Sequence, residues 1–250
     1  MIPFQKLNLN VKHLRGVTAH REGLDEVPSS CVLFHDFGQG FGRRAVDRTV
    51  YRNKASLSSV QWSRGRFGTC LKFDGINDYV TVPHASNIDF QTYFWMEMLV
   101  EPLEEFSSGD THGFWSKRSG TTIAPSLHFE GTPEIVLWIE TTSYKAVTTG
   151  TITLKEKRLY HIVATAKHND KTKNFIYVNN RQYQNNNTYR FFEHPTTPGY
   201  IGRHGGASSH YLHAKVYLVR LWDRLPTRHE VSNSYRRLLY YMNEWGYLLI

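Results

Sequence analysis

The sequence predicts an all-β protein with the architecture of an antiparallel β-sandwich of the jelly-roll type. Short segments in which apolar and polar residues alternate recur along the chain, and glycine, proline, serine and threonine separate them. Regular short strands with turn residues between them favour a sandwich over a parallel sheet. No segment before residue 226 shows the apolar spacing of a helix.

The stretch at residues 62–83 shows this pattern most clearly. Leu71 and Phe73 alternate with a lysine, which is typical of a half-buried strand. Asp74-Gly75 then interrupts the strand, as a tight turn does. Tyr79–Val82 is rich in β-branched and aromatic residues, so it predicts a second strand.

Residues 65–83 also carry a recognisable motif, G-R-F-G-x-x-L-x-F-D-G-x-N-D-Y-V-x-V-P. This motif resembles the signature of the laminin-G-like domains of the concanavalin A-like sandwich superfamily. Five further segments resemble strands of the same family, in the family's order and over roughly residues 32–231: Leu33–Gly40, Tyr160–Thr165, Phe175–Asn180, Tyr200–Arg203 and Val219–Arg224. The resemblance implies the same sandwich fold.

The remaining segments predict further strands and one helix. The strands are expected at Tyr93–Val100, Phe114–Lys117, Ser126–Glu130, Glu134–Thr141 and Ala146–Thr153. Thr227 is a good N-cap, and Glu230 three residues later completes a capping box, so a helix is expected from there to about Met242. The pair Arg236-Arg237 is expected to face solvent or an acidic partner.

The family resemblance divides the chain into three parts: an N-terminal arm at 1–30, the sandwich at 31–225, and a helix with an apolar tail at 226–250. The arm either pairs with a neighbouring subunit or is a disordered or locally packed terminus. Burying each large side chain of the tail is worth about 1.5–3 kcal/mol. We therefore expect an assembly interface, or burial on the chain's own sandwich, at Trp245, Tyr247, Leu248, Leu249 and Ile250.

Composition narrows the classes of partner. The chain has 250 residues and a formal net charge of +8, but its basic residues are scattered, so no specific nucleic-acid partner is expected. No apolar stretch approaches the roughly 20 residues that span a bilayer. The first residues contain no apolar run of the length expected for a signal peptide. Cys31 and Cys70 lie outside any C-x-x-C motif, and their pairing stays open, with buried thiols favoured.

No catalytic motif is evident, and we expect neither an enzyme nor a cofactor. Glu134 and Glu140 resemble the outer carboxylates of laminarinase-type hydrolases, but Val136 replaces the middle one. On a straight strand the two glutamates would lie about 20 Å apart, whereas a retaining pair needs about 5 Å. The clustered histidines at 204, 210 and 213 have no carboxylate among them, which favours incidental loop residues over zinc ligands.

The family often binds calcium, but this chain departs from the pattern, so no metal is expected. Where the family has a glycine-rich loop after Asp47, three basic side chains disfavour a cation: Arg48, Arg52 and Lys54. Tyr217 and Leu218 replace an acidic pair in the last strand. Calorimetric titration with millimolar calcium should therefore show no heat and no gain in melting temperature; a clear stabilisation would contradict this prediction.

The expected function is non-enzymatic binding or assembly, on the exterior of a cell or on a particle. The first hypothesis is a virion or particle-surface structural protein that uses the sandwich for attachment or capsid decoration. The alternative is a secreted carbohydrate-binding module, and a glycoside hydrolase comes third. The partner would be a glycan or protein on a cell or particle surface, with other virion or homo-oligomer subunits. The ligand is expected at Trp115, Trp138, Tyr144, Arg203 and His204.

Overall fold

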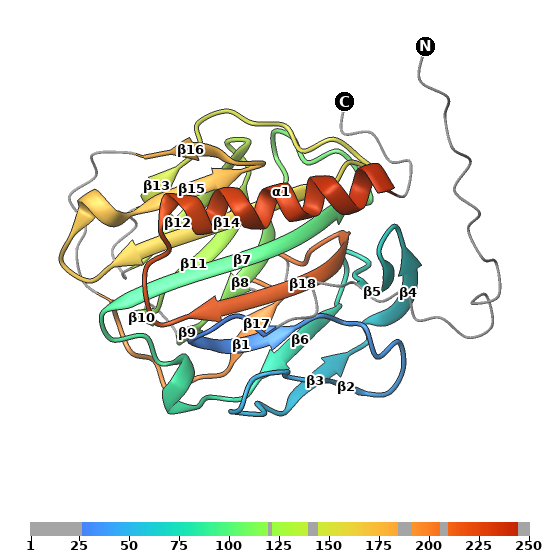
Figure 1. Cartoon of the computed structure of the whole chain (residues 1–250), viewed down its shortest axis with the longest axis horizontal. Coiled ribbons are helices and arrows are strands. Elements are labelled where there is room, and N and C mark those ends of the chain that lie inside the picture. The colour runs from blue at the N-terminus through green and yellow to red at the C-terminus, as the bar shows by residue number, and fades with distance from the viewer. Residues whose placement is uncertain (1–26, 120–121, 140–144, 185–191, 206–209, 245–250) are drawn as a thin grey trace, which may run out of the picture.

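The computed structural model describes residues 27–119, 122–139, 145–184, 192–205 and 210–244. Two antiparallel sheets stack face to face, and one helix follows them in the chain (Figure 1). The predicted fold class, an all-β antiparallel sandwich followed by a C-terminal helix, is therefore confirmed. Residues 1–26 of the predicted arm at 1–30, the predicted interface residues at 245–250 and the predicted ligand residue Tyr144 lie outside the described residues.

Sheet A contains the longest strands of the protein. Its order is β16 (Arg181–Tyr183), β15 (Phe175–Val178), β14 (Tyr160–Lys167), β7 (Tyr93–Pro102), β18 (Ala214–Trp222), β5 (Gly68–Lys72) and β4 (Gln61–Gly65), and β1 (Cys31–His35) also pairs with β18. β7 and β18 therefore form the centre of this sheet.

Sheet B contains the strands of the other layer. Its order is β13 (Lys145–Thr148), β12 (Glu134–Trp138), β11 (Ser126–Glu130), β8 (His112–Ser116), β17 (Gly199–Ile201), β6 (Tyr79–Val82), β3 (Ala55–Ser58) and β2 (Arg44–Ala45). Smaller elements lie outside the two sheets: the ribbon of β9 (Arg118–Ser119) and β10 (Thr122–Ile123), and the 3₁₀ turns η2 (Ser86–Ile88) and η3 (Lys171–Lys173).

The main core lies between the sheets, and β7 shows how the sequence builds it. Phe94, Met96 and Met98 point into this core, because alternate residues of a strand face the same side. Trp95 and Leu99 point to the other face of sheet A and join a second apolar cluster. A strand with apolar residues on both faces has to be covered on both sides.

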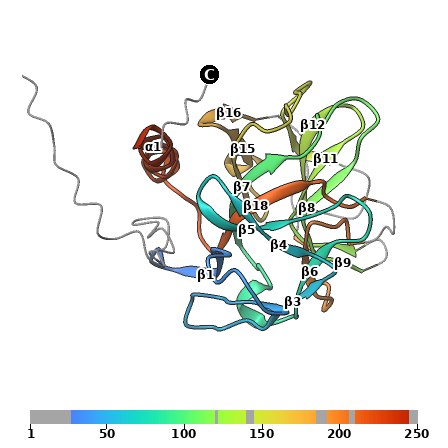
Figure 2. The ribbon, with the colours of Figure 1, turned by 90° about the vertical axis from the view of Figure 1, so that its right-hand side faces the viewer.

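The helix α1 (Arg228–Glu244) covers that second face of sheet A. Figure 2 shows it on the side of sheet A that is turned away from sheet B. Val231 and Leu238 of the helix belong to the same buried cluster as Tyr217, Leu218 and Trp222 of β18. The apolar second face of β18 is therefore covered by the helix that precedes the predicted tail.

The predicted capping box at the start of α1 is confirmed. The Glu230 backbone N–H donates to the Thr227 hydroxyl at 3.1 Å, and the Thr227 backbone N–H donates to the Glu230 carboxylate at 2.7 Å. Arg236 and Arg237 are exposed, as expected. None of the helices in the described part of the chain combines the length and the apolar character that crossing a bilayer requires.

Two local features explain why the stretch at 62–83 folds as it does. A β-carbon on Gly65 would lie 2.4 Å from the Tyr217 ring, so only glycine lets β4 approach β18 this closely. Gly75 has φ +78°, and the Asp74 carboxylate accepts the Ile76 backbone N–H at 2.8 Å to close the turn.

Cys31 and Cys70, both described, are buried and are not joined by a disulfide bond. Burial raises the pKa of the Cys31 thiol to about 12, although the charge of Arg220 opposes this. A thiol with such a pKa is protonated and unreactive at neutral pH.

Candidate functional site: an aromatic patch and a cavity under the helix

The outer face of sheet B, which is turned away from sheet A, holds three of the five predicted ligand residues. Trp138 lies on this face at the end of β12, and Arg203 and His204 follow β17 and pack over Gly113 of β8. β12 and β17 are three strand spacings apart in the sheet, or about 14 Å. The structure therefore brings Arg203 and His204 together and leaves Trp138 apart.

Trp115 does not lie on this face, so its predicted role as a ligand platform is not supported. It is fully buried in the core between the sheets, directly opposite Ile201 and Leu127. A register shift in the pairing of β8 with β11 lies between Leu127 and His128, and Phe114 is buried in the same core. Simple alternation cannot predict which way two adjacent aromatic residues point at such an irregularity.

Three tyrosines surround Arg203, and we call these four residues the tyrosine–arginine patch: Tyr79, Tyr200, Tyr211 and Arg203. The ring centroids of Tyr79 and Tyr200 are 5.8 Å apart, and those of Tyr79 and Tyr211 are 6.3 Å apart. The Arg203 guanidinium carbon lies 4.9 Å from the Tyr79 ring centroid and 4.8 Å from that of Tyr200. All four side chains are half-buried.

The Arg203 guanidinium is held by rings rather than by acceptors. Its Nε is buried and has no hydrogen-bond partner among the described residues. No described carboxylate forms an ion pair with this arginine. A guanidinium that packs against two aromatic rings is a fixed donor of several hydrogen bonds, and here those donors have capacity left for a ligand.

A row of hydroxyl groups continues the patch across the sheet. Tyr200 lies directly opposite Thr81 of β6, and Thr81 lies directly opposite Ser56 of β3. Residues that are directly opposite share one face of a sheet. Thr81 is half-buried and Ser56 is exposed, so the hydroxyl groups lie beside the aromatic rings.

The turn after β17 fixes Arg203 in this position. Gly202 has φ +84°, and a β-carbon there would lie 2.3 Å from the Phe73 ring, so this residue has to be glycine. Arg203 and Tyr211 form an isolated antiparallel bridge, and the His204 backbone N–H donates to the His210 carbonyl at 3.1 Å.

Three histidine rings gather beside the patch. The His128 and His204 ring centroids are 4.4 Å apart, and those of His204 and His210 are 5.6 Å apart. Burial, together with the charge of Arg118, lowers the pKa of His204 to about 4, and burial lowers that of His128 well below its usual value. His213 instead lies 3.0 Å from the Glu104 carboxylate. Within the described ranges, no three potential metal ligands are grouped as a metal site requires.

Trp138 and two glutamates form a separate cluster at the other end of the outer face. The Trp138 indole N–H donates to the Glu130 carboxylate at 2.6 Å. Glu134 lies directly opposite Glu130, and its carboxylate accepts the hydroxyl protons of Thr132, at 2.6 Å, and of Thr148. Glu140, the other glutamate of the predicted hydrolase-like motif, lies outside the described residues.

The loop that resembles a calcium-binding segment is closed by hydrogen bonds of its own. The Asp47 carboxylate accepts backbone N–H groups of Phe34, Thr49 and Asn53 at 2.9–3.1 Å. Burial would raise the pKa of Asp47, but these donors and the Asn53 side chain lower it. Arg48 lies 2.7 Å from the Asp36 carboxylate.

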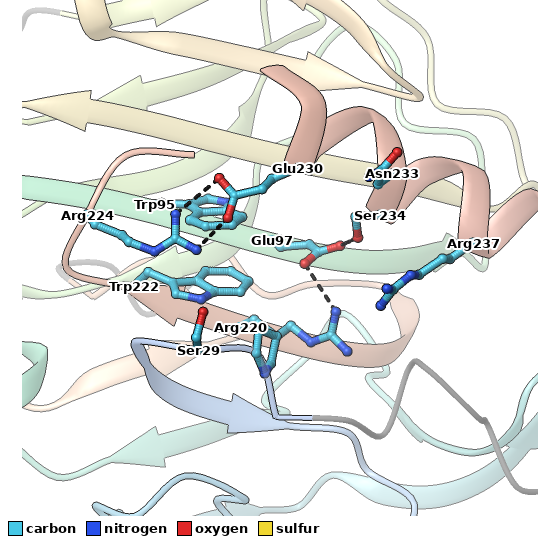
Figure 3. Close-up of a pocket in the computed structure, with 11 residues that line it drawn as sticks. Ser29, Trp95, Glu97, Arg220, Trp222, Arg224, Glu230, Asn233, Ser234 and Arg237 are labelled. Atoms are coloured by element: carbon cyan, nitrogen blue, oxygen red, sulfur yellow. Dashed lines mark hydrogen bonds and ion pairs between the residues drawn. The ribbon is translucent and has the colours of Figure 1, made fainter. Parts of the chain in front are cut away.

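A cavity of about 190 Å³ lies on the other side of the molecule, between α1, β7, β18 and the residues before β1 (Figure 3). Trp95 and Trp222 form part of its lining and stack on each other, with ring centroids 3.7 Å apart and an interplanar angle of 11°. The Arg224 guanidinium lies 4.7 Å from the Trp95 ring centroid and binds Glu230 through two hydrogen bonds of 2.6 and 3.2 Å.

Glu97 is the buried carboxylate of this cavity. Its oxygens accept hydrogen bonds from Arg220 at 3.4 Å and from the Ser234 hydroxyl (Figure 3). They also accept one from His161 Nε2 at 2.7 Å. Burial alone would raise the pKa of the Glu97 carboxyl, but the charge of Arg220 and the hydrogen bonds from His161 and Ser234 lower it to about 2. Glu97 is therefore ionised throughout the physiological range.

Most residues of both sites carry no signal in the sequence. The tyrosines of the patch carry no motif beyond strand alternation, and they come from positions 79, 200 and 211. Glu97 does carry a signal, because it is the single charged residue in the apolar run Tyr93–Val100. A charged residue in the middle of such a strand is a candidate for a buried, paired group.

Comparison with solved structures shows the fold. One similar structure is domain 4 of AbnA, a GH43 extracellular arabinanase from Geobacillus stearothermophilus, which was solved in complex with arabinotriose. It superposes on this chain with a TM-score of 0.64 at 13% sequence identity, and the match covers 82% of this chain and 97% of that domain. The binding domain of Paraclostridial Mosquitocidal Protein 1 has a TM-score of 0.62 and 12% identity, covering 85% of this chain and 52% of that one.

A sialidase from Trypanosoma rangeli, solved with sialic acid, has a TM-score of 0.62 and 16% identity, covering 84% of this chain. The chain spans about a third of the length of that sialidase, 33%. No curated protein sequence matches the chain. The sequence profile of a laminin-G-like family, described as the Concanavalin A-like lectin/glucanases superfamily, matches residues 74–232, which is well over half of the chain. The chain belongs to this family.

Proposed function

We propose that this protein is a non-enzymatic binding module that attaches to a glycan through the tyrosine–arginine patch on the outer face of sheet B. The observation that carries the proposal is Arg203, whose guanidinium packs against the rings of both Tyr79 and Tyr200 with donors left for a ligand. The hydroxyl groups of Thr81 and Ser56 lie beside it on the same face.

This combination suits a sugar for two physical reasons. The C–H faces of a sugar ring pack on tyrosine rings, which supply apolar area and keep a polar hydroxyl group at the rim. The hydroxyl groups of the sugar, or a carboxylate on it, accept hydrogen bonds from a guanidinium whose position is already fixed. A fixed donor costs less conformational entropy on binding than a flexible one does.

The family and its neighbours support a carbohydrate ligand. The solved arabinanase domain carries arabinotriose, and the sialidase structure carries sialic acid. These proteins share the fold with this chain at 13% and 16% identity.

The absence of catalysis is part of the proposal. Glu130 and Glu134 face each other on the outer face, but their oxygens are engaged by Trp138, Thr132 and Thr148. A catalytic pair needs one carboxyl group free to protonate the leaving group. Turnover of a β-glucan or an arabinan by the pure protein would contradict this part of the proposal.

The role on a virion or other particle surface stays a prediction. It depends on the arm at 1–30 and the tail at 245–250, and residues 1–26 and 245–250 lie outside the described part of the chain. The same holds for an exterior location, which we propose because a glycan-binding module meets its ligand there.

A glycan array followed by calorimetry tests the proposal. We expect the protein to bind at least one glycan class, and Arg203→Gln or Tyr200→Ala to weaken that binding about tenfold or more, equivalent to about 1.4 kcal/mol. Arg181→Gln is the matched control, because Arg181 stacks on Tyr183 at 5.1 Å in sheet A, away from the patch. If both variants bind the glycan as tightly as the unmodified protein does, the glycan binds elsewhere on the molecule. If the protein binds no glycan on the array, the proposal is overturned.

A further inference from the structure

The cavity under α1 is independent of the tyrosine–arginine patch. It lies on the face of sheet A that is turned away from sheet B, whereas the patch lies on the outer face of sheet B. The sandwich core separates the two. A ligand in this cavity would therefore leave the patch accessible.

The acceptors of this cavity are already engaged. Glu97 accepts hydrogen bonds from His161, Arg220 and Ser234, as described above. Glu230 accepts two hydrogen bonds from Arg224 and one from the Thr227 backbone N–H. Neither carboxylate is left to attract a cation, because each has a guanidinium beside it.

Donors, in contrast, are in excess. Three arginines line the cavity against two carboxylates. Arg237 is the arginine outside both ion pairs, and it has no hydrogen bond or ion pair with any described residue. The indole nitrogens of Trp95 and Trp222 are buried donors that have no partner within the described part of the chain. Leaving a buried donor without an acceptor costs about 1–3 kcal/mol.

The size of the cavity restricts its ligand. A volume of about 190 Å³ is that of several waters, at about 30 Å³ each, and lies below the 300–1,000 Å³ that is usual for drug-sized ligands. It accommodates a group of the size of a phosphate or a monosaccharide acid. An oxyanion supplies acceptors for the unpaired donors of the lining and a negative charge that compensates the excess arginine.

We propose that this cavity binds a small oxyanion, a phosphate or a carboxylate on a small molecule, with Arg237 as the residue that captures it. Arg237 reaches the cavity from α1, and Figure 3 shows its guanidinium on the side of Glu97 opposite to Arg224. Glu97 and Glu230 compensate the charges of Arg220 and Arg224, so the excess positive charge of the lining is that of Arg237. The stacked rings of Trp95 and Trp222 form one wall of the cavity, and their indole N–H groups are the unpaired donors described above.

The test uses the indole resonances of the full-length protein. Uniformly ¹⁵N-labelled protein is titrated with inorganic phosphate and, separately, with D-glucuronate, with D-glucose as the neutral control. Trp95→Phe and Trp222→Phe assign the two indole cross peaks. We expect saturable shifts of these two peaks with one or both anions and none with glucose, and the arm that saturates at lower concentration identifies phosphate or carboxylate chemistry.

Arg237→Gln should weaken the anion at least tenfold, whereas Arg236→Gln should leave its affinity unchanged. The control removes the same charge from the neighbouring exposed position of α1, and Arg236 does not line the cavity. Equal weakening by both variants would indicate only a general effect of charge and would overturn the proposal, as would the absence of saturable shifts. Arg203→Gln should not affect these shifts, so failure here is distinguishable from failure of the glycan proposal.

Discussion

Replacing Glu97 with alanine is expected to lower the free energy of unfolding by about 3–5 kcal/mol. The carboxylate and its partners Arg220 and His161 are all at least 95% buried as side chains. Removing the carboxylate leaves a buried guanidinium without its counter-charge, and this accounts for most of the cost. Urea unfolding at pH 7 measures the effect.

Glu105→Ala is the matched control for this variant. Glu105 pairs with Lys155 at 2.6 Å, but both side chains are about half exposed, at 47% and 51%. An exposed ion pair contributes only about 0–1 kcal/mol, so we expect a loss within that range. If Glu97→Ala and Glu105→Ala cost the same, the buried cluster does not stabilise the fold as described.

The contribution of Glu97 should also depend on pH in a defined direction. Its pKa is about 2 in the folded protein against an ordinary value of 4.5, so the folded state binds the proton more weakly than the unfolded state does. The stabilisation is therefore complete above about pH 4.5 and is lost as the pH falls toward 2. The difference between these two pKa values corresponds to about 3 kcal/mol in the free energy of unfolding.

Glu97→Gln tests this pH dependence because the amide does not titrate. The difference in unfolding free energy between the unmodified protein and Glu97→Gln should shrink between pH 6 and pH 3. A difference that stays constant over this range, or grows toward acid, would show that Glu97 does not carry the predicted low pKa.

The strands could be predicted from the sequence because their signal is local. Tyr79–Val82 and Ser126–Glu130 are strands with the predicted bounds, since alternation and turn residues within a few positions determine them. The helix start was predictable for the same reason, because a capping box spans only four residues. Both sites, in contrast, are assembled from residues far apart in the chain.

Glu230 has one role that the local sequence predicts and a second role that it does not. The sequence predicts its role in the capping box, which the structure confirms. The same carboxylate also neutralises Arg224, whose guanidinium lies over the Trp95 ring and so places it at the cavity. Only the packing of α1 on sheet A brings Trp95 and Glu230 together, and no pattern along the chain encodes that contact.

Trp115 was predicted to bind the ligand, but the structure buries it in the core between the sheets. Replacing it distinguishes a role in ligand binding from a role in stability. Trp115→Ala is expected to cost about 3–5 kcal/mol, because a buried aromatic side chain leaves a cavity when it is truncated. Its ring packs so closely on Gly199 that a β-carbon there would lie 2.2 Å away, so the ring fills the space over that glycine and its removal empties it. Urea unfolding measures the loss, and Trp115→Phe should show a smaller one.

Trp138→Ala is the control, because Trp138 is half-buried at the surface and its indole N–H donates to Glu130. It should lose less stability than Trp115→Ala, since most of the space left by its side chain opens to solvent. A Trp115→Ala protein that keeps its unfolding free energy but loses glycan binding would restore the ligand role and contradict the buried position. If Trp115 is a core residue, the folded Trp115→Ala protein should bind the glycan with unchanged affinity and should unfold at a much lower urea concentration.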